Sequence, residues 1–558
     1  MMNTPSTTSP STTPSGTRSL PELGRAALMG LLAGAAALSL GELAAALAAP
    51  RPGPVIAVAN RVIDEAPVWF VNFGKAVFGL SDKPALVLGT IIISLVIAAG
   101  LGIASRRSPM PGIVGISLFG LVGLWAIAVD SQGGFGAGLL IALTAVVAGV
   151  VTLLVLRAQA GFGAAATTRP ETADGPSDAD ADGAASTVTD HPTNPLVSRR
   201  GFLNVAGAVG ATAALATAGA NVLRARSSAS DARDAVQLDS ALDATELAQQ
   251  IEAAGASPVG STEGITPLVV PNDEFYLIDT AILTPQVDPA SWELTIKGMV
   301  DNEVTYTYDD LLARATTVEP VTLSCVSNEV GGNLVGNAVW QGVPLTELLD
   351  EAGVDPAATQ IASRSVDGWT CGFPTELAYD GRTALVAIAM NDEPLPLRHG
   401  FPARLVVSGL YGYVSATKWL SEIEMTTLEG FDGYWIPRGW SKDGPVKTQS
   451  RIDTPRRGTS LPVGVEVPIA GVAWAPNIGI RTVEVQIDDG DWVEAELGES
   501  LGVNAWRQWR VTWTPAESGR HLIRVRATDE SGETQTSAVT PPAPSGATGW
   551  HEVSVSAA

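Results

Sequence analysis

The chain has little cysteine and little histidine, and both shortages exclude kinds of site. Cys325 and Cys371 are the only two cysteines in 558 residues, too few for a disulfide framework or a four-thiolate metal site. None of the four histidines falls in an apolar run, which argues against a histidine-ligated haem inside a membrane and against a multi-histidine zinc site. The two cysteines could still form one disulfide, or each could act alone.

Basic residues are scarce relative to acidic ones. Lys and Arg number 34 against 58 Asp and Glu, which gives a formal net charge of -24. A field of this sign repels a phosphate backbone, so we expect no nucleic acid among the partners.

Long apolar runs fill the N-terminal part of the chain. Each of four runs has about 18 to 25 residues, enough to cross a ~30 Å hydrocarbon core as a helix. They predict a four-helix transmembrane domain over residues 25–157, preceded by a disordered tail, 1–24, rich in Ser, Thr and Pro. The runs are 25–49, 84–105, 112–129 and 136–156.

Charges interrupt the segment between the first two runs. Residues 55–80 contain Asp64, Glu65 and Lys75 beside aromatic residues, so we interpret this segment as interfacial and amphipathic rather than as a span. Glu42 lies near the end of the first run, and we interpret it as facing the interface rather than as a functional carboxylate in lipid.

Loop charges predict the orientation of these helices. Arg106 and Arg107 follow the second run, and Arg157 follows the fourth. Because positively charged loops stay in the cytoplasm, the N-terminus and the segment after residue 157 are expected on that side. The acidic stretch 158–197 is typical of a disordered cytoplasmic linker.

An arginine pair precedes a further apolar stretch. Residues 198–203 have the sequence SRRGFL, and an Ala- and Gly-rich stretch follows. This pattern resembles a twin-arginine export signal, so 198–224 is predicted to be that signal and a fifth transmembrane helix. A plain positive-inside anchor is the alternative. Since the twin-arginine route carries folded protein, we expect an extracytoplasmic connector at 225–264 and a domain beyond it that received a cofactor before export.

Residues 265–430 mix strand-like and helix-like runs and predict an α+β domain. The run 321–325 is strand-like and ends at Cys325, and Gly331 and Gly332 make the following segment a turn-rich loop. A thiol at the end of a strand beside such a loop has room for a bulky ligand. A small buried hydrophobic residue is the ordinary alternative for a lone cysteine.

Three strings follow one another between residues 322 and 455: TLSCVSNEVGGNLVGNAVWQGVPLTELL, HGFPARLVVSGLYGYVSATKWL and GPVKTQSRIDTP. They resemble the cysteine segment, the second cofactor segment and the domain junction of the sulfite oxidase family of molybdopterin enzymes, over roughly 265–555. The resemblance implies a sulfite-oxidase-like molybdopterin-binding domain in a membrane-anchored, twin-arginine-exported form. It also implies that Cys325 is the catalytic residue and supplies a soft thiolate to molybdenum.

The same resemblance implies the other contacts of the cofactor. His399 and Arg404, in the motif HGFPAR, would hold the pterin and its phosphate, for which arginine offers a bidentate grip. Further contacts are implied for four polar residues: Asn272, Tyr276, Ser365 and Lys418.

Two departures from that family argue against sulfite itself as the substrate. Sulfite oxidases carry an arginine in the segment corresponding to PNDEFY, and a tyrosine where Cys371 aligns. Both groups serve the oxyanion substrate in that family. Arg364 or Arg438 could take the place of the missing arginine.

Residues 431–558 have the pattern of an all-β domain. Apolar and polar residues alternate in three runs with turn sequences between them, which is typical of an immunoglobulin-like sandwich. In the resembling family this domain mediates dimerisation, so a homodimer formed through it is one assembly to expect. Three tryptophans are expected to fill its core: Trp474, Trp492 and Trp513.

These features predict a multi-pass protein of the cell membrane with an extracytoplasmic catalytic domain. We expect two-electron oxygen-atom transfer at a molybdenum-molybdopterin cofactor, on a small oxyanion or sulfur compound. No intrinsic haem is expected, so a separate cytochrome or quinone-linked protein would exchange electrons with the domain, while lipid surrounds the helices. The alternative is a membrane-tethered, non-catalytic binding or sensor protein with a degenerate cofactor fold.

Overall fold

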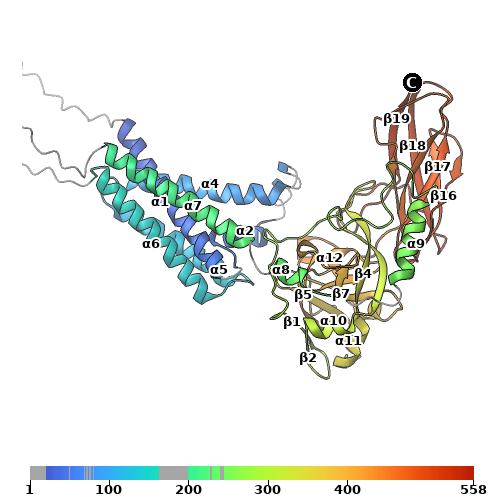
Figure 1. The fold of residues 1–558 in the computed structure, drawn as a ribbon, viewed down its shortest axis with the longest axis horizontal. Coiled ribbons are helices and arrows are strands. Elements are labelled where there is room, and N and C mark those ends of the chain that lie inside the picture. Colours follow the sequence, from blue (N-terminus) through green and yellow to red (C-terminus); the bar gives the residue numbers. More distant parts are fainter. Residues whose placement is uncertain are drawn as a thin grey trace, which may run out of the picture. The chain divides into compact units, whose positions relative to one another are not determined.

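The chain folds into two compact units, Met1–Ala225 and Arg226–Ala558. Figure 1 colours the first from blue to green and the second from green to red. The computed structural model describes residues 20–48, 51–67, 70, 73–74, 77–78, 81–162, 199–225, 229–238 and 244–558.

The first unit is a bundle of long apolar helices. Among the described residues, five helices are long and apolar enough to cross a membrane, and they match the four predicted runs and the stretch after the arginine pair. Helix α1 packs against α4, α6 and α7, and α5 packs against α6 (Figure 1). The five are α1 (Leu20–Leu47), α4 (Asp82–Ala104), α5 (Met110–Val129), α6 (Phe135–Gln159) and α7 (Arg199–Ala225).

Glycines let α1 and α4 approach each other closely. A Cβ atom on Gly30 would clash with the backbone carbonyl oxygen of Ala98, and one on Gly102 would clash with that of Ala26. Small residues at a helix crossing let the two backbones come into contact. Helices in lipid commonly associate in this way, because the hydrophobic effect does not drive apolar helices together there.

Helix α2 (Pro54–Glu65) lies in the segment predicted to be interfacial. It packs against α5, α4 and α1, and its first turn buries Val55 and Ile56. The amide of Val55 donates to the carboxylate of Glu42 at 3.0 Å, and the guanidinium of Arg224 pairs with the same carboxylate at 2.5 Å. Glu42 therefore stabilises the start of α2 and is not a carboxylate isolated in lipid. The interfacial location of 55–80 stays a prediction.

Three predicted flexible segments border these helices. The predicted tail, 1–24, ends inside α1, because that helix already begins at Leu20, and residues 1–19 lie outside the described part of the chain. Helix α6 likewise extends through Gln159 into the predicted linker, 158–197, and residues 163–197 of that linker are outside the description. The side chains of Arg199 and Arg200 are also outside it, so the export signal stays a prediction.

The connector at 225–264 contains α8 (Ala229–Asp234) and α9 (Ala244–Ala256).

The second unit begins with an α+β domain built on two sheets. Their strands alternate with short helices, as the sequence predicted. One sheet has the order β2 (Val304–Thr307), β1 (Glu293–Gly298), β10 (Leu420–Thr426), β5 (Gln360–Ser365), β6 (Thr370–Pro374). The other has the order β3 (Thr317–Ser324), β4 (Val335–Pro344), β7 (Ala384–Met390), β8 (Glu393–Pro394), with β9 (Arg404–Val407) also paired to β7. The helices are α10 (Tyr308–Arg314), α11 (Leu345–Ala352) and α12 (Gly412–Ser415).

The C-terminal part is all-β, as predicted, and its strands form two sheets around one apolar core. The first sheet has the order β11 (Gln449–Thr454), β13 (Val467–Trp474), β17 (Arg507–Trp513), β16 (Glu496–Leu497). The second has the order β12 (Ser460–Leu461), β19 (His551–Ala557), β18 (Gly519–Asp529), β14 (Ile480–Ile487), β15 (Trp492–Glu494). The immunoglobulin-like topology stays a prediction.

The predicted tryptophan core of this part was wrong in two respects. Trp509 fills the core between its two sheets, whereas Trp474 packs into the core of the α+β domain. Trp492 is only partly buried and stacks edge-on against Trp550. Trp513 packs against the β core from its rim, because it is the last residue of β17.

The two parts of the second unit interlock at strand β3. The indole of Trp506 is buried in the α+β core and donates to the carbonyl oxygen of Leu268 at 2.8 Å. The backbone amide of Trp506 donates to the hydroxyl of Thr322 at 2.8 Å, and the amide of Thr322 donates to the carbonyl oxygen of Asn504 at 2.9 Å. The strand that leads to Cys325 is therefore fixed by the C-terminal part.

Candidate functional site

Cys325 is the first residue after strand β3 and opens a hydrogen-bonded loop that ends where β4 begins. Its amide donates to the carbonyl oxygen of Leu334 at 2.9 Å, and its own carbonyl oxygen accepts from the amide of Asn328 at 3.0 Å. The side-chain oxygen of Asn328 accepts from the amide of Leu334 at 2.9 Å. Cys325 thus lies where the strand ends and the loop begins, as the sequence predicted, and the residue is 9% exposed.

The disulfide considered from the sequence does not form. Cys371 lies on β6 with a reduced thiol, whose Sγ contacts the hydroxyls of Ser363 at 3.3 Å and Thr417 at 3.1 Å. Burial raises the pKa of the Cys371 thiol to about 11, so it stays protonated at neutral pH. These contacts give Cys371 a structural role in the core.

Arg404 begins β9 as a buried cation, 4% exposed. Its Nη1 donates to the carbonyl oxygen of His399 at 3.1 Å and its Nε to that of Leu405 at 3.4 Å. Within the described parts of the chain, no carboxylate forms an ion pair with Arg404. Burial lowers its pKa to about 10, so the guanidinium remains charged at neutral pH. A buried charge without a counter-charge favours the binding of an anion.

His399 lies beside Arg404 and is neutral. Its Nε2 is 3.0 Å from the carbonyl oxygen of Asn272, and because a carbonyl only accepts, Nε2 carries the proton. Burial, reinforced by the nearby Lys418 and Arg404, lowers its pKa to about 3. The Nδ1 atom makes no hydrogen bond with the described residues, which leaves its lone pair for a ligand.

Tyr276 lies within electrostatic range of both Cys325 and Arg404. Burial raises the pKa of its hydroxyl, negative charge on Cys325 raises it further, and Arg404 acts in the opposite direction. Side chains from three separate segments are therefore close enough to influence one another. The neighbouring ring of Phe275 stacks on Tyr276 and meets His399 edge-on, with centroids 5.1 and 5.6 Å apart.

Lys418, two residues before strand β10, lies against the HGFPAR motif at Gly400. Its Nζ pairs with Asp279 at 2.8 Å and donates to the carbonyl oxygen of Arg398 at 3.0 Å. Gly400 has a φ of +114°, and a Cβ atom there would lie 3.0 Å from the Cα atom of Lys418. Glycine is needed here for both the backbone conformation and the close approach.

The side chains of Asn272 and Ser365, the other two predicted cofactor contacts, form hydrogen bonds with other residues of the protein. The amide nitrogen of Asn272 donates to the carbonyl oxygen of Met390 at 3.1 Å, and its side-chain oxygen accepts from Asn391 at 2.9 Å. Only its backbone carbonyl meets His399. The hydroxyl of Ser365 accepts from the amide of Asp367 at 3.3 Å and closes a turn. Neither of these side-chain bonds involves Cys325, His399 or Arg404.

Tyr411 lies within electrostatic range of Cys325, and the sequence did not point to it. It is buried, and this burial raises its pKa to about 12, with a further contribution from negative charge on Cys325. A Cβ atom on Gly546 would lie 2.5 Å from its hydroxyl oxygen, so a C-terminal loop covers this tyrosine. Tyr411 lies in the string HGFPARLVVSGLYGYVSATKWL, where the resemblance implied roles only for His399, Arg404 and Lys418.

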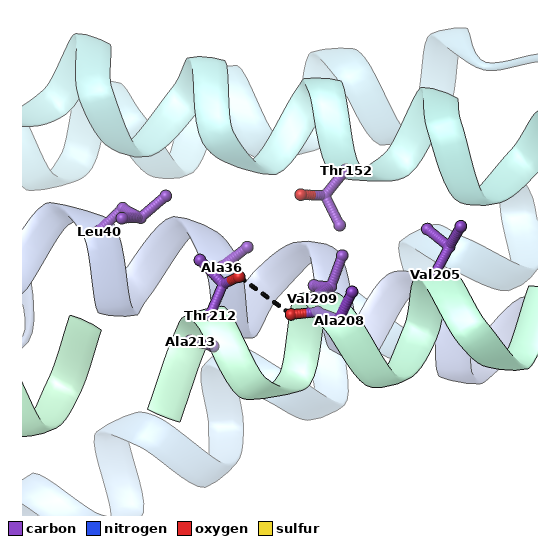
Figure 2. Close-up of a pocket in the computed structure, with 8 residues that line it drawn as sticks. All are labelled: Ala36, Leu40, Thr152, Val205, Ala208, Val209, Thr212 and Ala213. Atoms are coloured by element: carbon purple, nitrogen blue, oxygen red, sulfur yellow. Dashed lines mark hydrogen bonds between the residues drawn. The ribbon is translucent and has the colours of Figure 1, made fainter. Parts of the chain in front are cut away.

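A cavity in the first unit is separate from this chemistry. It lies between α1, α6 and α7 and measures about 220 Å³ (Figure 2). The only dashed contact drawn there is the bond from the hydroxyl of Thr212 to the carbonyl oxygen of Ala208, at 2.9 Å. Its lining is small and mostly apolar, with no titratable side chain: Ala36, Leu40, Thr152, Val205, Ala208, Val209, Thr212 and Ala213.

Comparison with known proteins agrees with this geometry. Residues 281–435 match the family model for the oxidoreductase molybdopterin binding domain. The oxidoreductase YuiH of Bacillus subtilis is 32% identical over 170 residues, which cover 30% of this chain and 82% of that protein. The chain belongs to the sulfite oxidase family of molybdopterin-dependent oxidoreductases.

Other members of the sulfite oxidase family match over a longer stretch. Mitochondrial sulfite oxidase of Rattus norvegicus is 29% identical over 321 residues, 49% of this chain and 58% of the rat protein. The chain thus spans less than two thirds of the length of this relative. The sulfane dehydrogenase SoxCD of Paracoccus pantotrophus has a TM-score of 0.43 at 23% identity, covering 54% of this chain and 87% of that one. The molybdopterin-binding domain implies a molybdenum cofactor.

Proposed function

We propose that the chain catalyses two-electron oxygen-atom transfer on a small oxyanion or sulfur compound, with Cys325 as the protein's ligand to molybdenum. The observation that carries the proposal is the buried charge of Arg404, which has no carboxylate partner among the described residues and acts, together with Cys325, on the buried Tyr276. A cation in such a place suits an anionic cofactor, and a thiol at the end of a strand suits a soft metal.

The residues present fit a molybdopterin. Arg404 would hold its phosphate through guanidinium donors that no described residue uses, and His399 would accept a hydrogen bond from a pterin N–H through Nδ1. Lys418, paired with Asp279, holds the backbone before His399 through the carbonyl oxygen of Arg398. Asn272 fixes the backbone that meets His399, and Ser365 closes a turn of its own segment. When bound, the cofactor supplies a metal that exchanges an oxygen atom and two electrons with the substrate.

Two tyrosines define the substrate side of this proposal. Burial raises the pKa values of Tyr276 and Tyr411 above that of an ordinary tyrosine, so both hydroxyls stay neutral at physiological pH and can act as hydrogen-bond donors. Neutral donors suit an oxyanion or the oxygen of a sulfoxide. The segment PNDEFY has no arginine, which disfavours sulfite as the substrate.

We also propose that the first unit anchors the enzyme in the cell membrane with its catalytic domain outside the cytoplasm. The five apolar helices support an anchor. Arg157 supports the orientation, because its Nε donates to the carbonyl oxygen of Ser105 at 3.0 Å and gathers positive charge beside Arg106 and Arg107. A cytochrome or quinone-linked protein then exchanges the electrons, and the C-terminal part forms a homodimer.

The test is turnover by the purified full-length protein. Sulfite, thiosulfate, sulfoxides and chlorate are each offered with a redox dye that accepts or donates electrons. We expect turnover of at least one compound, and its loss in Cys325→Ala with the fold intact. Absence of turnover throughout, together with absence of molybdenum, would favour the non-catalytic binding or sensor protein.

A further inference from the structure

The loop that follows Cys325 is held from outside by the C-terminal part of the second unit. Arg451, on β11, donates from Nη1 to the carbonyl oxygen of Gly332 at 2.9 Å. Its Nη2 donates to the hydroxyl of Thr266 at 2.8 Å, and its Nε pairs with Asp453 at 2.6 Å. The other carboxylate oxygen of Asp453 accepts from the amide of Thr266 at 3.0 Å. Each of the three guanidinium nitrogens of Arg451 therefore donates a hydrogen bond.

His551, the first residue of β19, packs on the adjacent residue of the loop. Its ring lies against Gly331, where an added Cβ atom would collide with the ring. The Nδ1 atom accepts from the amide of Ile452 at 2.9 Å, which fixes the ring next to Arg451. Burial lowers the pKa of His551 to about 4, so the ring is neutral and keeps this acceptor at neutral pH.

Hydrogen bonds within the loop itself add to these contacts from the C-terminal part. Inside the loop, Asn328 accepts from the amide of Leu334, and the amide of Gly332 donates to the carbonyl oxygen of Glu329 at 2.8 Å. A Cβ atom on Gly332 would lie 2.5 Å from the side-chain oxygen of Asn328. The loop is thus packed between the side chain of Asn328 and those of Arg451 and His551. Neither Gly331 nor Gly332 has room for a side chain.

We propose that Arg451 and His551 are positioning residues that set where the Cys325 thiol lies in the site. This inference deepens the proposed function, because it rests on Cys325 as the metal ligand. Charge-assisted hydrogen bonds from a buried arginine are strong and directional, and residues behind a metal ligand govern its orientation. It gives the C-terminal part a role in the chemistry of the site.

The first test uses cofactor-free, full-length protein, so that it does not depend on metal. In a Cys371→Ser background only Cys325 reacts with iodoacetamide. We expect Arg451→Met to raise its alkylation rate about tenfold, since losing the bonds to the loop increases local opening. Arg451→Lys, which keeps the charge and one donor, should give a smaller increase.

The matched control is Arg526→Met. Arg526 also forms a paired ion bridge on the C-terminal part, to Glu484 at 2.8 Å, but has no contact with the cysteine loop. Its alkylation rate should stay within about twofold of the parent, as expected for a substitution remote from the loop. Circular dichroism confirms that each variant compared has kept its fold.

His551 supplies an independent pair of variants. His551→Asn keeps a side-chain acceptor near the position of Nδ1 and should restore a rate close to that of the parent. His551→Leu removes the acceptor and should raise the rate as Arg451→Met does. Rates equal to the parent in both Arg451→Met and His551→Leu would overturn the inference.

A second readout uses the loaded protein. The thiolate-to-metal charge-transfer absorption should shift in Arg451→Met and stay unchanged in Arg526→Met, because it reports the orientation of the sulfur. An unchanged band in Arg451→Met would count against a positioning role. Full molybdenum content together with an unchanged thiolate absorption band in Cys325→Ala would instead remove the proposed ligand, while the alkylation result would still stand. The two failures are therefore distinguishable.

Discussion

The guanidinium carbon of Arg404 lies 4.9 Å from the centroid of the indole ring of Trp340. Trp340 is fully buried, so the arginine is held against an aromatic face inside the domain instead of against a carboxylate. A cation–π contact of this kind stabilises a charge by about 0.5–2 kcal/mol, well below the cost of burying it alone. The protein therefore maintains a cation that an anionic ligand would stabilise further.

Replacement of Arg404 should weaken cofactor binding. We expect Arg404→Met to lower molybdenum and pterin content about 10- to 100-fold, the usual cost of losing a residue that supports a metal site. Arg404→Lys should retain part of the content, because it keeps the charge without the fork of donors. Metal analysis and pterin fluorescence of the purified protein measure both effects.

The control for this variant is Arg364→Met. Arg364 is also a cation of the α+β domain, but its side chain is 46% exposed, and its pairing with Glu422 at 3.5 Å is long. Its loss should leave cofactor content unchanged. Equal content in Arg404→Met and Arg364→Met would contradict the assignment of the phosphate to Arg404.

The buried histidine of the C-terminal part should make stability depend on pH. Burial lowers the pKa of His551 from 6.5 to about 4, so the folded state binds fewer protons than the unfolded state between these values. Stability is therefore full above pH 6.5 and falls as the pH decreases toward 4, by about 1–3 kcal/mol for this group. Thermal unfolding followed by tryptophan fluorescence at pH 7, 5.5 and 4 measures the trend.

His551→Asn removes this titrating group while it keeps the acceptor. The variant should lose less stability than the parent between pH 6.5 and pH 4, and both should show the same dependence above pH 7. Parallel curves over the whole range would show that His551 is not buried in its neutral form.

Packing between helices α1 and α4 depends on Gly102. Gly102→Leu should destabilise the first unit by about 1–3 kcal/mol, because its side chain would meet the backbone of α1. Gly100→Leu is the matched control in the same helix, since nothing lies within 4 Å of a Cβ atom there. Thermal stability of the detergent-solubilised protein, followed by size-exclusion chromatography, should drop for the first variant alone.

The sequence predicted what local patterns encode. Apolar length identified the five long helices, and alternation identified strands such as β14 and β18. The position of Cys325 at the end of a strand followed from the apolar run before it and the glycines after it. Each of these signals lies within a few consecutive residues, which is why it can be recognised without a structure.

Contacts between distant segments escaped the sequence. Arg451 and Gly332 are 119 residues apart, and no local pattern marks their pairing. The same holds for Cys371, whose partner Thr417 comes from another segment, and for Tyr411. Alternation marked Trp509 and Trp513 as sharing a face, but only the packed sheets decide that Trp509 is the buried one.

The central claim is that the sulfur of Cys325 binds molybdenum. Its most direct test is the molybdenum content of wild-type protein and Cys325→Ala, expressed side by side in cells that make the cofactor, with Cys371→Ala as the matched cysteine control. We expect near-stoichiometric metal in the wild type and the Cys371 variant, with loss of the metal or of its thiolate absorption band in Cys325→Ala. The same metal content and the same band in all three proteins would contradict it.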